Sequence, residues 1–143
     1  MINDPFHKAL SEYGVREWAG VQHNPEVMKY FKEIGHRWVE TDETAWCSAF
    51  INWCAKTTGY EYSGKLNARS WLKVGEACKP EMGCLVVLWR ESEDSWKGHV
   101  GFLVRETIEY VYILGGNQTD QVKITSYPKS RVLSYRKLLK TTI

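Results

Sequence analysis

The spacing of hydrophobic residues changes near the middle of the chain, from a helical period to short runs that are typical of strands. Each of the first three helical segments is followed by a glycine, which is a common residue just past a helix end. Asn24 and Pro25 form a favoured pair for the start of the second segment, as N-cap and first helical residue. The predicted helices cover residues 5–13, 25–34, 45–58 and 70–76.

The second half of the chain contains five short runs rich in β-branched and aromatic residues, separated by polar and glycine-containing turns. The predicted strands cover residues 84–89, 100–105, 109–114, 121–125 and 132–135. No helical segment separates these runs, so we expect an antiparallel meander. Helices followed by strands indicate an α+β fold. Because the sequence shows no linker or internal repeat, we expect one domain over residues 1–143.

Composition and charge exclude several classes of function. Hydrophobic residues make up 43% of the 143 residues and charged residues 25%, as in an average globular chain, and a net charge of +2 is too small to favour nucleic-acid binding. No apolar run could span a membrane and no Sec-type signal is present, so we expect synthesis in the cytoplasm and reduced cysteines, with a Cys78–Cys84 disulfide as the alternative. The spacing of Cys and His does not resemble a zinc site, so neither a metal nor another cofactor is expected.

Cys47 is the first candidate for chemistry, because it falls about one turn inside the start of the third predicted helix. Unpaired N–H groups and the helix dipole favour a thiolate there, which would lower the pKa of the thiol, and the same N–H groups could hold an oxyanion. The alternative is a buried core thiol, because Cys47 shares one apolar stripe of the helix with Phe50 and Cys54.

His99 is the candidate general base, since it opens a predicted strand, lies between Gly98 and Gly101, which leave its edge uncrowded, and would face the start of the Cys47 helix. The hairpin that follows would bring residues 115–118 back beside His99. Either Asn117 or Gln118 could therefore orient the imidazole through its second nitrogen. The alternative for this Gly-Gly-Asn segment is an ordinary turn.

Five short blocks of sequence follow one another over most of the chain. They are DETAWCSAFINWC (42–54), ARSWL (68–72), GHVG (98–101), LGGNQ (114–118) and YPKSR (127–131). Together they resemble a phage-associated branch of the NlpC-type and CHAP cysteine peptidases, which are cell-wall hydrolases. The chain departs from the pattern at Trp46, where relatives usually have Asp, and at Gly83-Cys84, where they often have Gly-Asp.

The resemblance implies a papain-like fold, with N-terminal helices packed on a C-terminal antiparallel sheet of about five strands. It also implies hydrolysis of amide bonds in peptidoglycan stem peptides or cross-bridges, as in a bacteriophage endolysin. By position it assigns Cys47 as nucleophile, His99 as general base and then acid, and Asn117 as the third catalytic residue. The residues predicted to contact substrate are Trp46, Glu43, Gln118, Arg69 and Trp71.

Two other functions fit the same residues. An acyltransferase on this scaffold would move the acyl group to an amine or a lipid, and a non-catalytic wall-binding or immunity-related module would use Cys47 only as core. A toxin would differ in its deployment rather than in its chemistry. The expected site of action is the cell wall or periplasm, after release or delivery. Besides the peptidoglycan peptide, a delivery system, a holin or an immunity protein is the expected partner.

Overall fold

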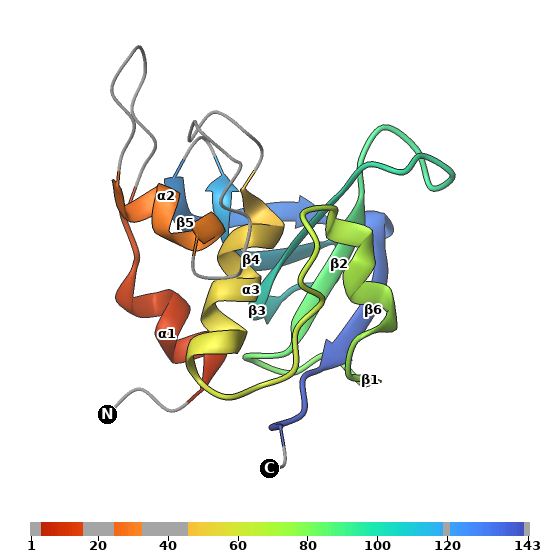
Figure 1. The fold of residues 1–143 in the computed structure, drawn as a ribbon. Helices are drawn as coiled ribbons and strands as arrows, with labels where there is room; N and C mark the ends of the chain where they lie inside the picture. Colours follow the sequence, from red (N-terminus) through yellow and green to blue (C-terminus); the bar gives the residue numbers. More distant parts are fainter. Residues whose placement is uncertain (1–3, 16–24, 33–45, 119–120, 142–143) are drawn as a thin grey trace.

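A computed structural model describes residues 4–15, 25–32, 46–118 and 121–141. Figure 1 shows three α-helices gathered on one side of a β-sheet, with α3 next to the sheet and α1 and α2 packed against α3. The helices are α1 (Pro5–Ser11), α2 (Pro25–Lys32) and α3 (Cys47–Thr57), with 3₁₀ helices η1 (Ala68–Lys73) and η2 (Lys129–Arg131). The strands are β1 (Glu76–Ala77), β2 (Leu85–Trp89), β3 (Gly98–Glu106), β4 (Tyr110–Gln118), β5 (Gln121–Pro128) and β6 (Val132–Lys137).

The first three helices form at the predicted places, within shorter bounds. Asp4 caps α1, because its carboxylate accepts a hydrogen bond of 2.9 Å from the backbone N–H of His7. The fourth prediction, a helix over residues 70–76, is wrong in its type and bounds. Residues 68–73 form the 3₁₀ helix η1, Val74 is already extended, and Gly75 adopts a φ of 70° before β1 begins. The predicted cap Asn24 and the start of the third helix before residue 46 lie outside the described residues.

All the described strands pair antiparallel in one six-stranded sheet, in the order β1-β6-β2-β3-β4-β5. The meander prediction is confirmed for β2 to β5. It is wrong for β6, which lies on the opposite side of β2, with Leu85 beside Arg136 and Val86 beside Tyr135. The chain therefore passes from one edge of the sheet, at β5, through η2 to a position near the other edge. The α+β class is confirmed.

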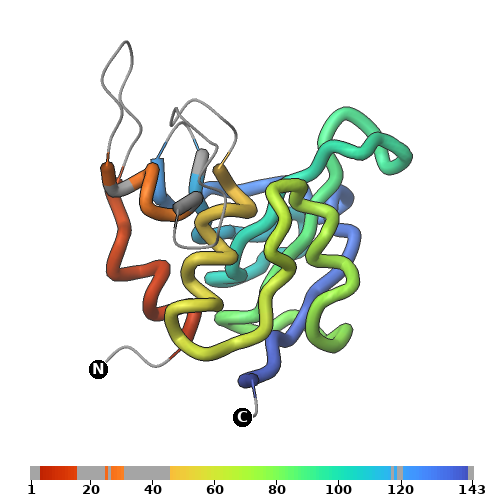
Figure 2. The backbone as a smooth tube through the Cα atoms, viewed as in Figure 1, coloured from red at the N-terminus to blue at the C-terminus, as the bar shows by residue number. Residues whose placement is uncertain are grey.

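The helix α3 is enclosed over most of its length rather than along one stripe. Nine consecutive residues, 47–55, are buried. Two of them are polar, and both use the carbonyl oxygen of Lys65: Ser48 donates to it at 2.7 Å and Asn52 at 2.9 Å. These bonds hold the segment after α3 alongside the helix, as the backbone tube in Figure 2 shows. Buried polar groups keep their partners in this way, so the helix can be covered on all sides.

Gly116 allows α3 to pack directly on β4. A Cβ atom at this position would lie 2.8 Å from the ring of Trp46 and 2.9 Å from Cβ of Phe50, closer than real side chains approach. We therefore expect Gly116→Ala to lower the free energy of unfolding by about 1–3 kcal/mol through overpacking. Urea denaturation would measure the change. The exposed substitution Ser126→Ala on β5 is the control, and equal midpoints for both variants would contradict the close approach.

Candidate active site

Cys47 is the first residue of α3, rather than a residue one turn inside it. The first hydrogen bond of the helix runs from the N–H of Phe50 to the carbonyl oxygen of Trp46, at 2.9 Å. The N–H groups of Cys47, Ser48 and Ala49 consequently have no acceptor within the helix. They form a cluster of donors at the positive end of the helix dipole, next to the thiol.

Burial raises the pKa of the Cys47 thiol, contrary to the expectation from helix position alone. The side chain is 6% exposed, so the loss of hydration penalises the thiolate. Backbone N–H groups of Val100 and Ser48, and then the charge of Arg90, act in the opposite direction without reversing the shift. The resting group is therefore a neutral thiol, which needs a base to become a nucleophile.

Gln118 holds the imidazole of His99 in one orientation. Its Oε1 lies 2.8 Å from Nε2 of His99, and both side chains are buried. The amide Nε2 of Gln118 donates to the carbonyl oxygens of Ile113 and Lys123, which requires its Oε1 to face His99. A carbonyl oxygen only accepts, so Nε2 of His99 carries the hydrogen. The neutral ring then presents Nδ1 as its basic nitrogen.

A bulge in β4 brings Gln118 to this position. The register between β4 and β5 shifts between Gly115 and Gln118, and the amide of Gln118 reaches back to the carbonyl of Ile113. Of the two residues left open by the sequence, Gln118 thus binds His99. Asn117 belongs to β4, but its side chain lies outside the described part of the structure, so its assignment as third catalytic residue stays a prediction.

Tyr127 joins the site, although no separate role was predicted for it within the YPKSR block. Its hydroxyl donates to Oε1 of Gln118 at 3.0 Å, and its ring centroid lies 5.2 Å from that of His99. Burial, and then the negative charge of an ionised Cys47, raise the pKa of Tyr127 to about 12. Tyr127 therefore lies within electrostatic reach of the thiol and against the imidazole.

Cys47 and His99 have two neighbours in common, Val100 and Tyr127. The thiol faces the N–H of Val100, the residue after His99, and Tyr127 interacts with both groups. Among the hydrogen bonds of the described residues, none joins the thiol directly to the imidazole. Catalytic hydrogen bonds of this kind often tighten only when substrate binds. The arrangement places a thiol, a neutral imidazole and a cluster of N–H donors at one end of α3.

Burial also lowers the pKa of His99, to about 4. The hydrogen bond to Gln118 opposes this shift, whereas the positive charges of Arg90 and Arg131 add to it. The imidazole is consequently neutral at pH 7, which is the state a general base requires.

The buried His99 should make the protein less stable as the pH falls from about 6.5 to about 4. The unfolded chain takes up the proton near pH 6.5 and the folded chain only near pH 4, so this stability is complete above 6.5 and is lost on acidification. The shift corresponds to about 3 kcal/mol. Urea unfolding at several pH values would measure the slope. His99→Gln should remove that part of it, and an unchanged slope in the variant would contradict the assignment.

Two tryptophans predicted to contact substrate lie in the core. Trp46 and Trp71 are both completely buried, so neither has surface that a substrate could touch. The indole N–H of Trp71 donates to Oγ of Ser48 at 2.9 Å, and the ring of Trp46 stacks on that of Tyr30 at 5.9 Å. This burial does not favour contact with substrate, and the predicted role stays a prediction for both. Glu43, named for the same role, lies outside the described residues.

Arg69 supports the loop between β2 and β3. Its Nε, Nη1 and Nη2 each donate to a backbone carbonyl, at 2.9, 2.6 and 2.9 Å. The acceptors are those of Lys97, Glu93 and Ser92, in that order. These bonds hold the loop that leads into the strand of His99. They give Arg69 a structural role, and its predicted contact with substrate stays a prediction.

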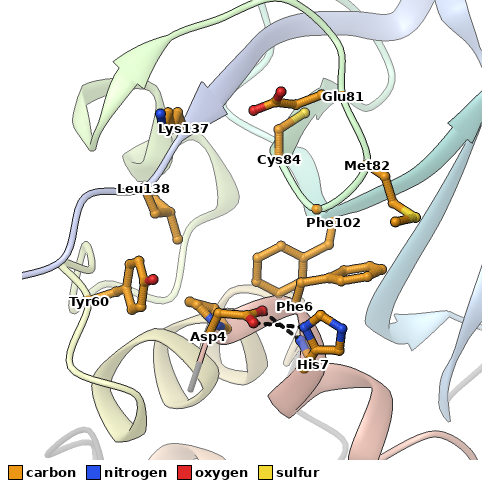
Figure 3. A pocket seen from close by; sticks show the side chains of 12 residues that line it. Asp4, Phe6, His7, Tyr60, Glu81, Met82, Cys84, Phe102, Lys137 and Leu138 are labelled. Carbon is orange, nitrogen blue, oxygen red and sulfur yellow. Dashed lines mark hydrogen bonds and ion pairs between the residues drawn. The ribbon is translucent and has the colours of Figure 1, made fainter. Parts of the chain in front are cut away.

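A separate pocket of about 300 Å³ lies at the other end of α3. Its walls include Phe6, Phe102 and Leu138, and Tyr60 lies just beyond the end of the helix (Figure 3). Eleven residues of α3 span roughly 16 Å at 1.5 Å per residue, which separates this pocket from Cys47. Neither Cys47 nor His99 lines it, so the pocket is not part of the candidate active site.

The remaining observations limit the chemistry of the described residues. Their four cysteines are free thiols, and no group of three or more His, Cys, Asp or Glu side chains among them is arranged to hold a metal ion. None of the helices in this part of the chain has the length and apolar character needed to cross a membrane.

A comparison with protein-family models finds none that matches the chain, and a comparison with curated proteins finds no match either.

Proposed function

We propose that the protein is a cysteine-dependent peptidoglycan hydrolase that cleaves an amide bond in cell-wall peptides, with the papain-like fold of the NlpC-type and CHAP enzymes. The observation that carries the proposal is the Gln118–His99 hydrogen bond, which leaves Nδ1 of a neutral imidazole as a base next to the start of α3. A thiol at a helix start, an imidazole on a strand and an amide that orients the imidazole are the parts of a Cys–His–amide hydrolase. The five sequence blocks support the choice of substrate.

The first half of the reaction forms a thioester. Nδ1 of His99 accepts the proton of the Cys47 thiol while the sulfur attacks the carbonyl carbon of the peptide. The carbonyl oxygen becomes an oxyanion, which the N–H groups of Cys47 and Ser48 stabilise. The intermediate then collapses, the C–N bond breaks, and the proton on Nδ1 passes to the leaving amine.

The second half hydrolyses the thioester. Nδ1 of His99 accepts a proton from water as the water oxygen attacks the thioester carbon, and the C–S bond then breaks. The proton returns to the sulfur, which regenerates the thiol and releases a carboxylic acid. Through both halves Gln118 acts as a positioning residue, because its Oε1 accepts from Nε2 of His99 whether the ring is neutral or protonated.

Digestion of purified sacculi by the wild-type protein tests the reaction class. Mass spectrometry of the soluble products should show new amino groups and acyl fragments that have gained one water. Acyl fragments joined to an added amine in place of water would identify an acyltransferase. Binding of the protein to sacculi without any new amine would refute the enzyme and support the wall-binding module.

A further inference from the structure

Arg131 lies beside the candidate active site, and two nitrogens of its guanidinium form no hydrogen bond with the described residues. It ends η2, where the chain crosses from β5 to β6, and its Nε donates to the carbonyl oxygen of Trp89 at 3.0 Å. The guanidinium carbon lies 5.5 Å from the ring centroid of Trp89 and 5.7 Å from that of Tyr127. Within the described residues, Nη1 and Nη2 have no hydrogen-bond acceptor.

This setting prepares the guanidinium to bind an anion. One carbonyl and two aromatic rings hold its plane, and the two free nitrogens form an edge that matches the two oxygens of a carboxylate. Tyr127 connects this edge to the catalytic residues, since its hydroxyl binds the same Gln118 oxygen that binds His99. An anion on Arg131 would therefore lie one aromatic side chain away from the imidazole.

The charge around the site favours the same kind of ligand. Among the described residues, the charged side chains whose fields act on His99 are Arg90 and Arg131, and both also act on Tyr127. A cationic site attracts anionic ligands and disfavours cationic ones. Arg69, the arginine predicted from the sequence to meet a substrate carboxylate, is instead engaged by loop carbonyls. Arg131 is the arginine whose surroundings suit that task.

We propose that Arg131 is a specificity residue that binds a free carboxylate of the acyl peptide beside the scissile amide, so that the preferred substrate is an anionic peptide. This inference rests on the proposed function. A carboxylate bound there also neutralises the charge that disfavours a protonated His99, which makes the imidazole a stronger base once substrate is in place. The preference therefore acts on catalysis as well as on binding.

Soluble muropeptides released from sacculi, with free carboxylates, and the same muropeptides after carbodiimide coupling to methylamine provide paired probes. For the wild-type protein we expect kcat/KM to be at least ~10-fold higher for the free-carboxylate form. Arg131→Gln should remove most of this preference while still cleaving the amidated form, and Arg131→Lys should retain part of it. Arg105→Gln is the matched control, because Arg105 stacks on Tyr112 at 4.1 Å and contacts none of the catalytic residues.

Calorimetric titration of the Cys47→Ala protein with both probes measures the preference without turnover. Tighter binding of the carboxylate form that is lost on adding Arg131→Gln supports the inference. Equal binding of the two forms, or a preference that survives Arg131→Gln in a folded protein, overturns it. Cleavage that continues in the Cys47→Ala protein would refute the proposed function instead. The two failures therefore give different results.

Discussion

Replacing Cys47 by alanine should abolish cleavage of cell-wall peptides, with kcat/KM falling by a factor of about 10⁴–10⁶, as expected for loss of a nucleophile that acts as a unit with its base. The imidazole, the Gln118 hydrogen bond and the N–H groups at the start of α3 would remain. They cannot form a thioester without the sulfur. The assay follows the appearance of new amines from sacculi by mass spectrometry, with the wild-type protein at the same concentration.

Cys54→Ala is the matched control for this experiment. Cys54 lies two turns further along α3 and is completely buried in the core, so the substitution removes the same atom from the same helix. We expect it to lower stability and to leave kcat/KM of the folded protein nearly unchanged. Equal residual activity of Cys47→Ala and wild type would remove Cys47 from the mechanism. Equal losses in both variants would mean that the effect comes through the helix packing rather than through the thiol.

Local sequence signals predicted most of the elements and the meander of β2 to β5, but not the position of β6. The strand runs and the helices follow from hydrophobic period and terminal residues, which act over a few positions. The position of β6 beside β2 depends on pairing between residues far apart in the chain, such as Leu85 and Arg136, and no local pattern encodes it. The strand β1 has only two residues, too few for any period to appear.

The candidate site likewise combines residues that local sequence signals indicate with residues that only long-range contacts place. Cys47 and His99 could be predicted because each carries its own signal, a helix start and a strand start. The choice of Gln118 required the bulge in β4, the approach of Tyr127 required the pairing of β5 with β4, and that of Arg131 required the crossover from β5 to β6. The expected lowering of the Cys47 pKa was wrong in sign, because the helix dipole is a local effect and burial is a tertiary one.

Residue type alone does not show whether Trp46 and Trp71, the two tryptophans predicted to contact substrate, lie in a groove or in the core. Large aromatic side chains serve a core as readily as a groove, and only packing decides between the two. Trp71 is completely buried and uses its N–H to bind Ser48 within α3, whereas Trp89 is partly exposed and stacks on Arg131. The tryptophan next to the proposed carboxylate site is therefore Trp89, which residue type alone could not distinguish from Trp71.

Gln118→Leu should reduce kcat/KM by a factor of about 10²–10⁴ while leaving both Cys47 and His99 in place. Without an acceptor at Oε1, the hydrogen of the imidazole is no longer confined to Nε2. A ring with its hydrogen on Nδ1 cannot accept the thiol proton there. Because this substitution would also leave the carbonyls of Ile113 and Lys123 without their donor, the unfolding midpoint has to be measured on the same protein preparation.

Gln118→Glu tests whether residue 118 controls the proton on His99 or only packs against the ring. A carboxylate still accepts from Nε2, so the tautomer is kept, but its negative charge stabilises the imidazolium and raises the pKa of His99 from about 4. The base is then lost at a higher pH, and the acidic limb of the kcat/KM profile should move toward neutrality, with more activity at pH 8 than in Gln118→Leu. A profile with an unshifted acidic limb would mean that Gln118 only packs against the ring and does not govern its proton.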